Sequence, residues 1–174
     1  MNLTEILHRL AFLAKTKELG ELILKLRLEG VGRAVNFNAA DDAGEAALVH
    51  CVRGAHELRA ANPESYRACL RFLVEHGASA NRRDALGRTA LHWAVGCKLP
   101  AIVEELLALG ADPTVEDDGG RAAIHFGIQA KATECIDVLI TKGPGKVMLV
   151  VGLTRMIVSS DIIIYAINCG HVKF

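Results

Sequence analysis

The sequence predicts an all-α solenoid of stacked helix pairs with short hairpin-like connecting loops, followed by a C-terminal tail that does not repeat. Two observations lead to this fold class. When the chain is shifted by 33 residues, "DALGRTALHWAVG" falls on "DDGGRAAIHFGIQ". Within each unit, apolar residues recur at helical spacing and a glycine closes the segment. A period of this length is typical of repeat proteins, in which each unit buries its apolar face only against its neighbours.

The repeat predicts the course of each helix pair. The first helix follows a Gly-x-Thr-Ala turn, and the second carries Ile102, Val103, Leu106 and Leu107 on one face. Pro100 suits the first turn of that second helix. A glycine at ease with positive φ is expected to end it, and three glycines stand 33 residues apart at Gly77, Gly110 and Gly143.

The pattern Asp-x-x-Gly-x-Thr-Ala-Leu-His, closing with Leu-Leu-x-x-Gly-Ala-Asp, resembles the ankyrin repeat. The resemblance implies an N-terminal capping helix pair at residues 1–36 and three repeats within 37–143. We name the repeats unit 1 (41–77), unit 2 (84–110) and unit 3 (117–143). Unit 1 contains an insertion near residues 53–62, and the tail comprises residues 144–174.

His92 stands beside the only tryptophan and raises the question of a catalytic role. It recurs as His125 at the same phase, which is typical of a residue that forms a turn. The family pattern implies that the Thr89 hydroxyl caps the first helix and that the histidine ties the turn to the neighbouring loop. We therefore expect a structural turn role for five residues: Gly87, Thr89, His92, Gly120 and His125. We interpret Trp93, whose equivalents are His50 and Phe126, as part of the packed framework.

The sequence contains no pattern that predicts catalysis. It has no nucleophile elbow, Walker loop or metalloprotease helix, and its histidines lack ligand spacing. We therefore expect no enzyme, no cofactor and no metal, although a reactive Cys97 thiol would revive an enzymatic reading. With 20 basic and 20 acidic residues, no electrostatic footprint for nucleic acid is present. Five cysteines without a Cys-x-x-Cys pair favour free thiols in the cytoplasm, with the nucleus as an alternative.

The ankyrin resemblance implies a protein partner, of unknown identity, bound by the hairpin tips and by the face of the first helices. Arg83 and Arg88 flank Leu86 and form the predicted hot spot, since arginine is enriched in such spots. The alternative is that these side chains are only solvated. By motif position, the candidate binding residues are Asp42, Glu45, Arg53, Arg83, Leu86, Arg88, Cys97, Glu116, Asp118, Arg121 and Gln129.

The tail leaves three readings open. The run from Val147 to Cys169 is long enough to span a bilayer, which would make the chain a membrane-tethered adaptor. Arg155 and Asp161 fall inside this run and argue against a span. The β-branched residues around "SSD" favour two β-strands instead. The abrupt change of composition after Gly143 is also consistent with a translated intron.

Overall fold

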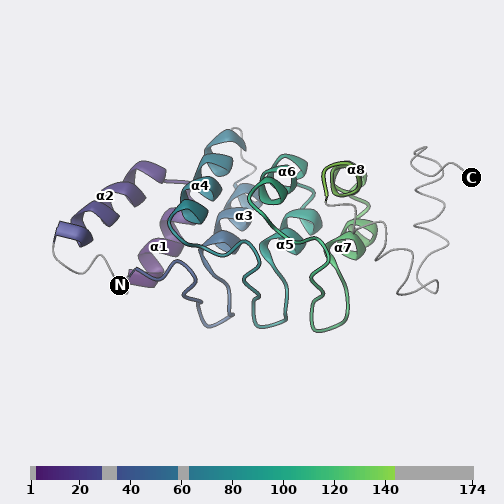
Figure 1. The fold of residues 1–174 in the computed structure, drawn as a ribbon, viewed down its shortest axis with the longest axis horizontal. Coiled ribbons are helices and arrows are strands. Elements are labelled where there is room, and N and C mark those ends of the chain that lie inside the picture. The colour runs from purple at the N-terminus through teal and green to yellow at the C-terminus, as the bar shows by residue number, and fades with distance from the viewer. Residues whose placement is uncertain (1–2, 29–34, 59–62, 144–174) are drawn as a thin grey trace, which may run out of the picture.

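The computed structural model describes residues 3–28, 35–58 and 63–143, and these form four successive helix pairs (Figure 1). The described helices run side by side, and the loops between successive pairs all project to the same side of the array. Isolated antiparallel bridges join Ala40 to Ala46 and Glu116 to Ala122, so the loops before the third and seventh helices are short hairpins. The helices are α1 (Leu3–Phe12), α2 (Thr16–Leu28), α3 (Ala47–Glu57), α4 (Pro63–Glu75), α5 (Ala90–Gly96), α6 (Pro100–Ala108), α7 (Ala123–Ala130) and α8 (Thr133–Lys142).

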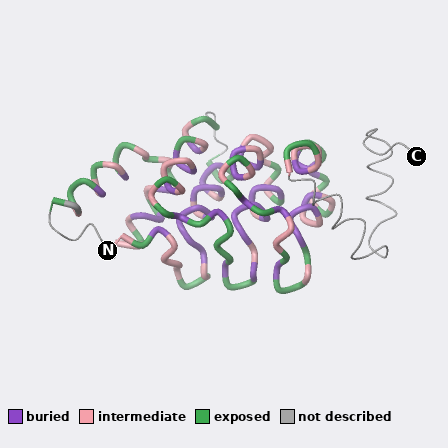
Figure 2. Tube along the Cα trace, in the orientation of Figure 1, coloured by how far each residue is buried: buried purple, intermediate pink, exposed green. Residues whose placement is uncertain are grey.

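The helices form two layers. The first helices of the pairs pack in the order α1, α3, α5, α7, and the second helices pack in the order α2, α4, α6, α8. Buried residues line the space between the layers along the whole array (Figure 2). Leu91 of α5 and Leu106 of α6 are fully buried there. The apolar spacing of the sequence therefore builds one continuous core, as predicted for an all-α repeat solenoid.

The insertion in unit 1 is partly helical. α3 has 11 residues, whereas α5 has 7 and α7 has 8, so the segment up to Glu57 lengthens this first helix. Gly54 lies in the added turn, and a Cβ at this position would collide with the backbone of Phe12 at the end of α1. A glycine therefore allows the longer α3 to lie against the N-terminal helix pair.

The predicted helix ends are found in units 1 and 2. Pro100 occupies the first turn of α6. Gly77 and Gly110 follow α4 and α6 with φ of 97° and 86°, the left-handed conformation that ends many helices. Gly143 differs, because its φ of −65° and ψ of 148° are those of extended backbone.

No helix among the described residues is long and apolar enough to cross a membrane. Residues 144–174 lie outside the described part of the chain, so the membrane span, the two β-strands and the translated intron stay predictions.

Candidate partner-binding surface

One aspartate organises each of the three hairpin tips, which we define as residues 40–46, 83–89 and 116–122. In unit 2, Oδ1 of Asp84 accepts the backbone N–H groups of Leu86 and Arg88, both at 2.9 Å. Asp41 and Asp117 do the same in the other units, at 2.8–2.9 Å. Burial raises the pKa of all three carboxyls, but these N–H donors and the neighbouring side chains outweigh it and lower the pKa values. Each tip is thus built around an ionised carboxylate at neutral pH.

Neighbouring tips are held against each other. The backbone N–H of Asp118 donates to the carbonyl of Leu86 at 3.0 Å. Nη2 of Arg83 lies 2.8 Å from Oδ1 of Asp118, and its Nε donates to the carbonyl of Gly87. Gly87 has a φ of 76°, and a Cβ there would collide with Arg83 and Asp118. The close approach of the second and third tips therefore requires a glycine at this position.

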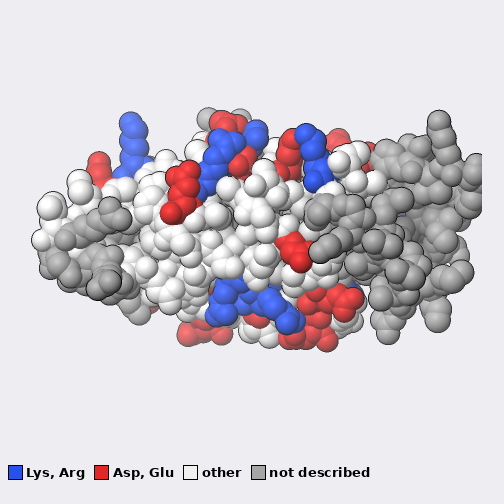
Figure 3. Space-filling model, in the orientation of Figure 1, with Lys and Arg blue, Asp and Glu red and all other residues white. Residues whose placement is uncertain are grey.

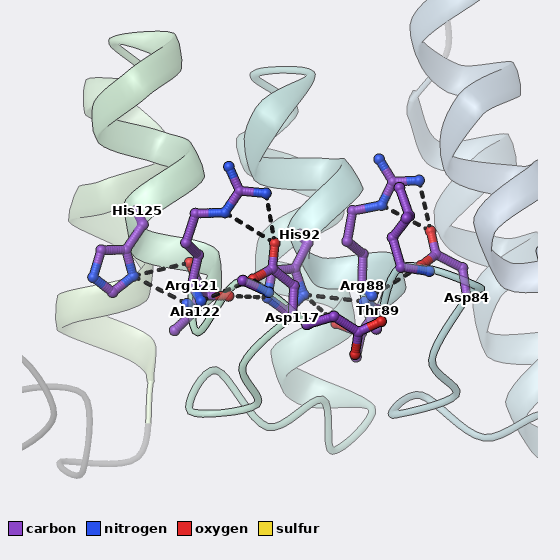
Figure 4. A network of polar contacts seen from close by, with 12 residues as sticks. Asp84, Arg88, Thr89, His92, Asp117, Arg121, Ala122 and His125 are labelled. Atoms are coloured by element: carbon purple, nitrogen blue, oxygen red, sulfur yellow. Dashed lines mark hydrogen bonds and ion pairs between the residues drawn. The ribbon is translucent and has the colours of Figure 1, made fainter.

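His92 links unit 2 to unit 3. Its Nδ1 accepts the backbone N–H of Thr89 at 3.0 Å and lies 2.9 Å from the Thr89 hydroxyl. The proton of the neutral ring is therefore assigned to Nε2, which donates to the carbonyl of Arg121 at 3.1 Å. Burial lowers the pKa of this imidazole, although the Arg121 carbonyl opposes the shift. His92 is buried and binds its own turn through Nδ1 and the next tip through Nε2, a geometry that supports the turn role proposed for it (Figure 4).

His125 repeats half of this arrangement. Its Nδ1 accepts the backbone N–H of Ala122 at 3.0 Å. Alanine has no hydroxyl to match that of Thr89, so the side-chain half of the turn is missing in unit 3. No partner for Nε2 of His125, equivalent to the Arg121 carbonyl that binds His92, lies among the described residues.

Arginine and aromatic side chains cover the first-helix face next to the tips. The guanidinium of Arg88 lies 4.4 Å from the centre of the Trp93 ring and also binds Oδ2 of Asp84. Trp93 Nε1 donates to the same oxygen at 3.2 Å. In unit 3, Arg121 binds Asp117 and lies 4.9 Å from the centre of the Phe126 ring. Both aspartates are thereby neutralised within their own unit, and Trp93 belongs to the framework.

The structure places the predicted binding residues at different depths. Arg53, Arg88 and Cys97 are half-buried. Glu45 is buried, and its carboxylate binds Arg53 at 2.8 Å. A carboxylate enclosed in this way cannot face a partner, so we remove Glu45 from the candidate binding set. The exposed members are Asp42, Arg83, Leu86, Glu116, Asp118, Arg121 and Gln129.

The exposed residues around Leu86 differ from the predicted hot spot, in which Arg83 and Arg88 flank this leucine. Leu86 is 57% exposed, but the guanidinium groups of Arg83 and Arg88 are already occupied by Asp118 and Asp84. Arg82 is exposed, and its side chain has no partner among the described residues. It lines a shallow hollow of about 360 Å³ along the second tip, which Gly44 of the first tip and Asp118 of the third also line. Sequence reasoning missed Arg82 because the two neighbouring arginines cannot be told apart before their contacts are known.

The charges along the row of tips alternate in sign. Basic side chains gather between two acidic patches at the edge formed by the tips (Figure 3). The exposed residues there are Asp42 in the first tip, Arg82 and Arg83 at the second, and Glu116 and Asp118 at the third. A surface of this kind selects partners with complementary charge.

Stacked helix pairs joined by projecting hairpins define a repeat protein. The sequence matches the family model described as ankyrin repeats (3 copies) over residues 7–117 and 59–150. The chain therefore belongs to the ankyrin repeat family. It is also similar to an ankyrin repeat protein of Acanthamoeba polyphaga mimivirus, with 44% identity over 54 residues. That similarity covers 31% of this chain and 7% of the viral protein.

Proposed function

We propose that this chain is a non-enzymatic adaptor that binds a protein partner through its hairpin tips and first-helix face, in a reducing compartment such as the cytoplasm. Ankyrin repeats are generally protein–protein interaction modules. The observation that carries the proposal is the row of exposed tips, fixed in place by bonds between neighbours and centred on Leu86. The equivalents of Leu86 are Ala43 and Gly119, so the fold does not need a large apolar side chain there.

The chemistry of the described side chains supports a binding role over a catalytic one. Burial raises the pKa of the Cys97 thiol, and it raises that of Cys135 to about 11, so little thiolate forms at neutral pH. His92 uses both ring nitrogens to hold the turn. None of these three groups is available as a nucleophile or base.

Affinity capture from the native cell tests the proposal. The wild-type chain is compared with an Arg82→Glu, Leu86→Ser variant, which alters the second tip without breaking the Arg83–Asp118 or Arg88–Asp84 pairs. The control is Glu75→Lys, an exposed charge reversal at the end of α4, away from the tips. Proteins retained on the beads are identified by mass spectrometry.

A protein retained by the wild type and by Glu75→Lys, but lost with the tip variant, is the expected result. Truncation of a central apolar anchor is expected to weaken binding by about tenfold or more. Identical captures from all three chains would contradict the proposed surface.

A further inference from the structure

Three side chains with metal-ligating atoms meet where the N-terminal helix pair contacts unit 1. His8 comes from α1, Asp41 from the start of the first tip, and His50 from α3. A ring nitrogen of each histidine and a carboxylate oxygen of Asp41 all lie within 4.8 Å of one another. His50 Nε2 is 3.0 Å from Oδ2 of Asp41. The two imidazole rings stack with their centres 4.4 Å apart.

This cluster arises where unit 1 departs from units 2 and 3. In those units, the second oxygen of the tip aspartate binds an arginine four residues later. Unit 1 has Glu45 at the arginine position, and Glu45 turns away to Arg53. Among the described residues, Oδ2 of Asp41 therefore has one hydrogen-bonding side-chain partner, the His50 ring. Aspartate and imidazole face each other without a competing guanidinium.

His8 and Asp41 are in the protonation states that a metal ion requires at neutral pH. Burial lowers the pKa of His8, and the neighbouring His50 lowers it further. Burial raises the pKa of Asp41, but the N–H groups of Glu45 and Ala43 and the His50 ring lower it overall. A neutral imidazole and an ionised carboxylate are the ligating forms. His8 Nε2 donates to the carbonyl of Ala39 at 3.0 Å, a contact that commonly orients metal-bound histidines and that leaves Nδ1 of the neutral ring as the ligating atom.

We propose that His8, Asp41 and His50 bind a divalent transition-metal ion of the Zn²⁺ type. Two imidazoles and one carboxylate suit such an ion, and three protein ligands leave a coordination position for water. The side chain of Asp41 is 33% exposed, so an ion can reach the cluster from solvent. Because His8 belongs to α1 and the other two ligands to unit 1, the ion would join the N-terminal helix pair to the first repeat.

Zinc titration of the full chain under reducing conditions tests the site. Affinity is measured by competition with a chromophoric chelator for the wild type, His8→Gln, His50→Gln and the control His56→Gln. His56 is exposed near the end of α3 and lies outside the cluster. We expect the wild type and His56→Gln to share one zinc site that is weakened about tenfold or more in the other two variants. Equal affinity in all four chains, or no binding to the wild type, would overturn the proposal.

A second measurement does not depend on the His8 variant folding well. Zinc should raise the midpoint of thermal unfolding of the wild type, since the ion binds the folded chain at ligands from two helix pairs. His50→Trp places in unit 1 the residue found at the equivalent position of unit 2, where Trp93 donates to its aspartate. This variant should fold and lose the zinc-dependent shift. Retention of the full shift in His50→Trp would exclude His50 as a ligand.

Discussion

Units 1 and 2 both begin with an aspartate whose Oδ1 organises a hairpin tip, but their other carboxylate oxygen meets different side chains. In unit 2, Asp84 binds Arg88 and Trp93, and Arg88 covers the Trp93 ring. In unit 1, Asp41 faces His50, whose ring stacks on His8. Two exchanges accompany this change, because Glu45 stands at the position of Arg88 and His50 at that of Trp93. The same backbone hairpin thus supports an aspartate paired with arginine and tryptophan in unit 2, and an aspartate paired with histidine in unit 1.

The two units also differ in the hydrogen bonds that join each of them to the following unit. Unit 2 uses Thr89 and His92 to reach the Arg121 carbonyl of unit 3. Unit 1 has Ala46 and Val49 at these positions, and both are buried apolar residues. Both units share a second polar contact, in which an asparagine before the tip binds the end of the same unit. The amide of Asn38 binds the carbonyl of Gly77 and the N–H of Ser79, and that of Asn81 binds the carbonyl of Gly110 and the N–H of Asp112. Unit 2 has the histidine bond in addition and is expected to be the better anchored.

The largest effect is expected in the core that both units share. Leu91→Ala removes a fully buried side chain of α5, and the cavity should cost about 2–5 kcal/mol of unfolding free energy. Denaturant unfolding measures this loss. Leu86→Ala, at an exposed tip position, is the matched control and should change stability by less than about 0.5 kcal/mol. Similar losses for the two variants would contradict the placement of these leucines.

Gly87 and Gly120 have the same backbone conformation, but only at Gly87 do other residues lie close to the position of an added Cβ. Alanine at the two positions therefore distinguishes the cost of backbone strain from that of a steric clash. Gly87 and Gly120 have φ of 76° and 71°, so alanine at either position should cost about 1–2 kcal/mol in backbone strain. A Cβ at Gly87 would also collide with Arg83 and Asp118, whereas nothing lies within 4 Å of the same atom at Gly120. Gly87→Ala should therefore lose more stability than Gly120→Ala in thermal and denaturant unfolding. An equal loss would show that the second and third tips do not pack closely.

Replacement of His92 should weaken the hydrogen bond from unit 2 to the Arg121 carbonyl of unit 3, for which unit 1 has no counterpart. His92→Gln removes ring contacts to Thr89 and Arg121, and we expect a loss of about 1–2 kcal/mol. The folded-state pKa of His92 lies below its usual value of 6.5, so the unfolded chain takes up the proton first as the pH falls. The contribution of His92 is therefore complete above about pH 6.5 and is lost as the pH falls through the folded-state value.

The unfolding free energy of both chains, measured between about pH 7.5 and about pH 5.5, checks this sign. The wild type should lose more stability on acidification than His92→Gln does. Parallel pH profiles would mean that His92 titrates alike in the folded and unfolded chains.

The smallest effect is expected at the contact between tips. Arg83→Ala breaks the pair with Asp118, but the side chains are 48% and 63% exposed and solvent screens their attraction. The loss should stay within about 0.5 kcal/mol and should shrink further in high salt. A loss that is large and independent of salt would place Arg83 in a buried network rather than on a tip.

The sequence predicted the fold well because the signals that set it are local and repeated. The Asp, Gly and His positions of units 2 and 3 lie 33 residues apart, and each histidine accepts the N–H of the residue three positions earlier. Contacts between units were not predictable in the same way. Arg83 and Asp118 are 35 residues apart, and their pairing depends on how closely two tips stack. The burial of Glu45 likewise follows from its contact with Arg53.

The histidine cluster was missed for a related reason. His8 lies in a helix pair without the repeat signature, 42 residues before His50. Metal-ligand spacing within one segment therefore gave no indication of it. Only the packing of α1 against α3 brings the two rings together.

We propose that the tips and the first-helix face bind a protein partner. Hydrogen–deuterium exchange of the full chain, with and without the captured partner, maps the bound surface. We expect added protection to concentrate at residues 40–46, 83–89 and 116–122 and along α5 and α7. Protection confined to the second helices α4, α6 and α8, with unchanged exchange at the tips, would contradict it.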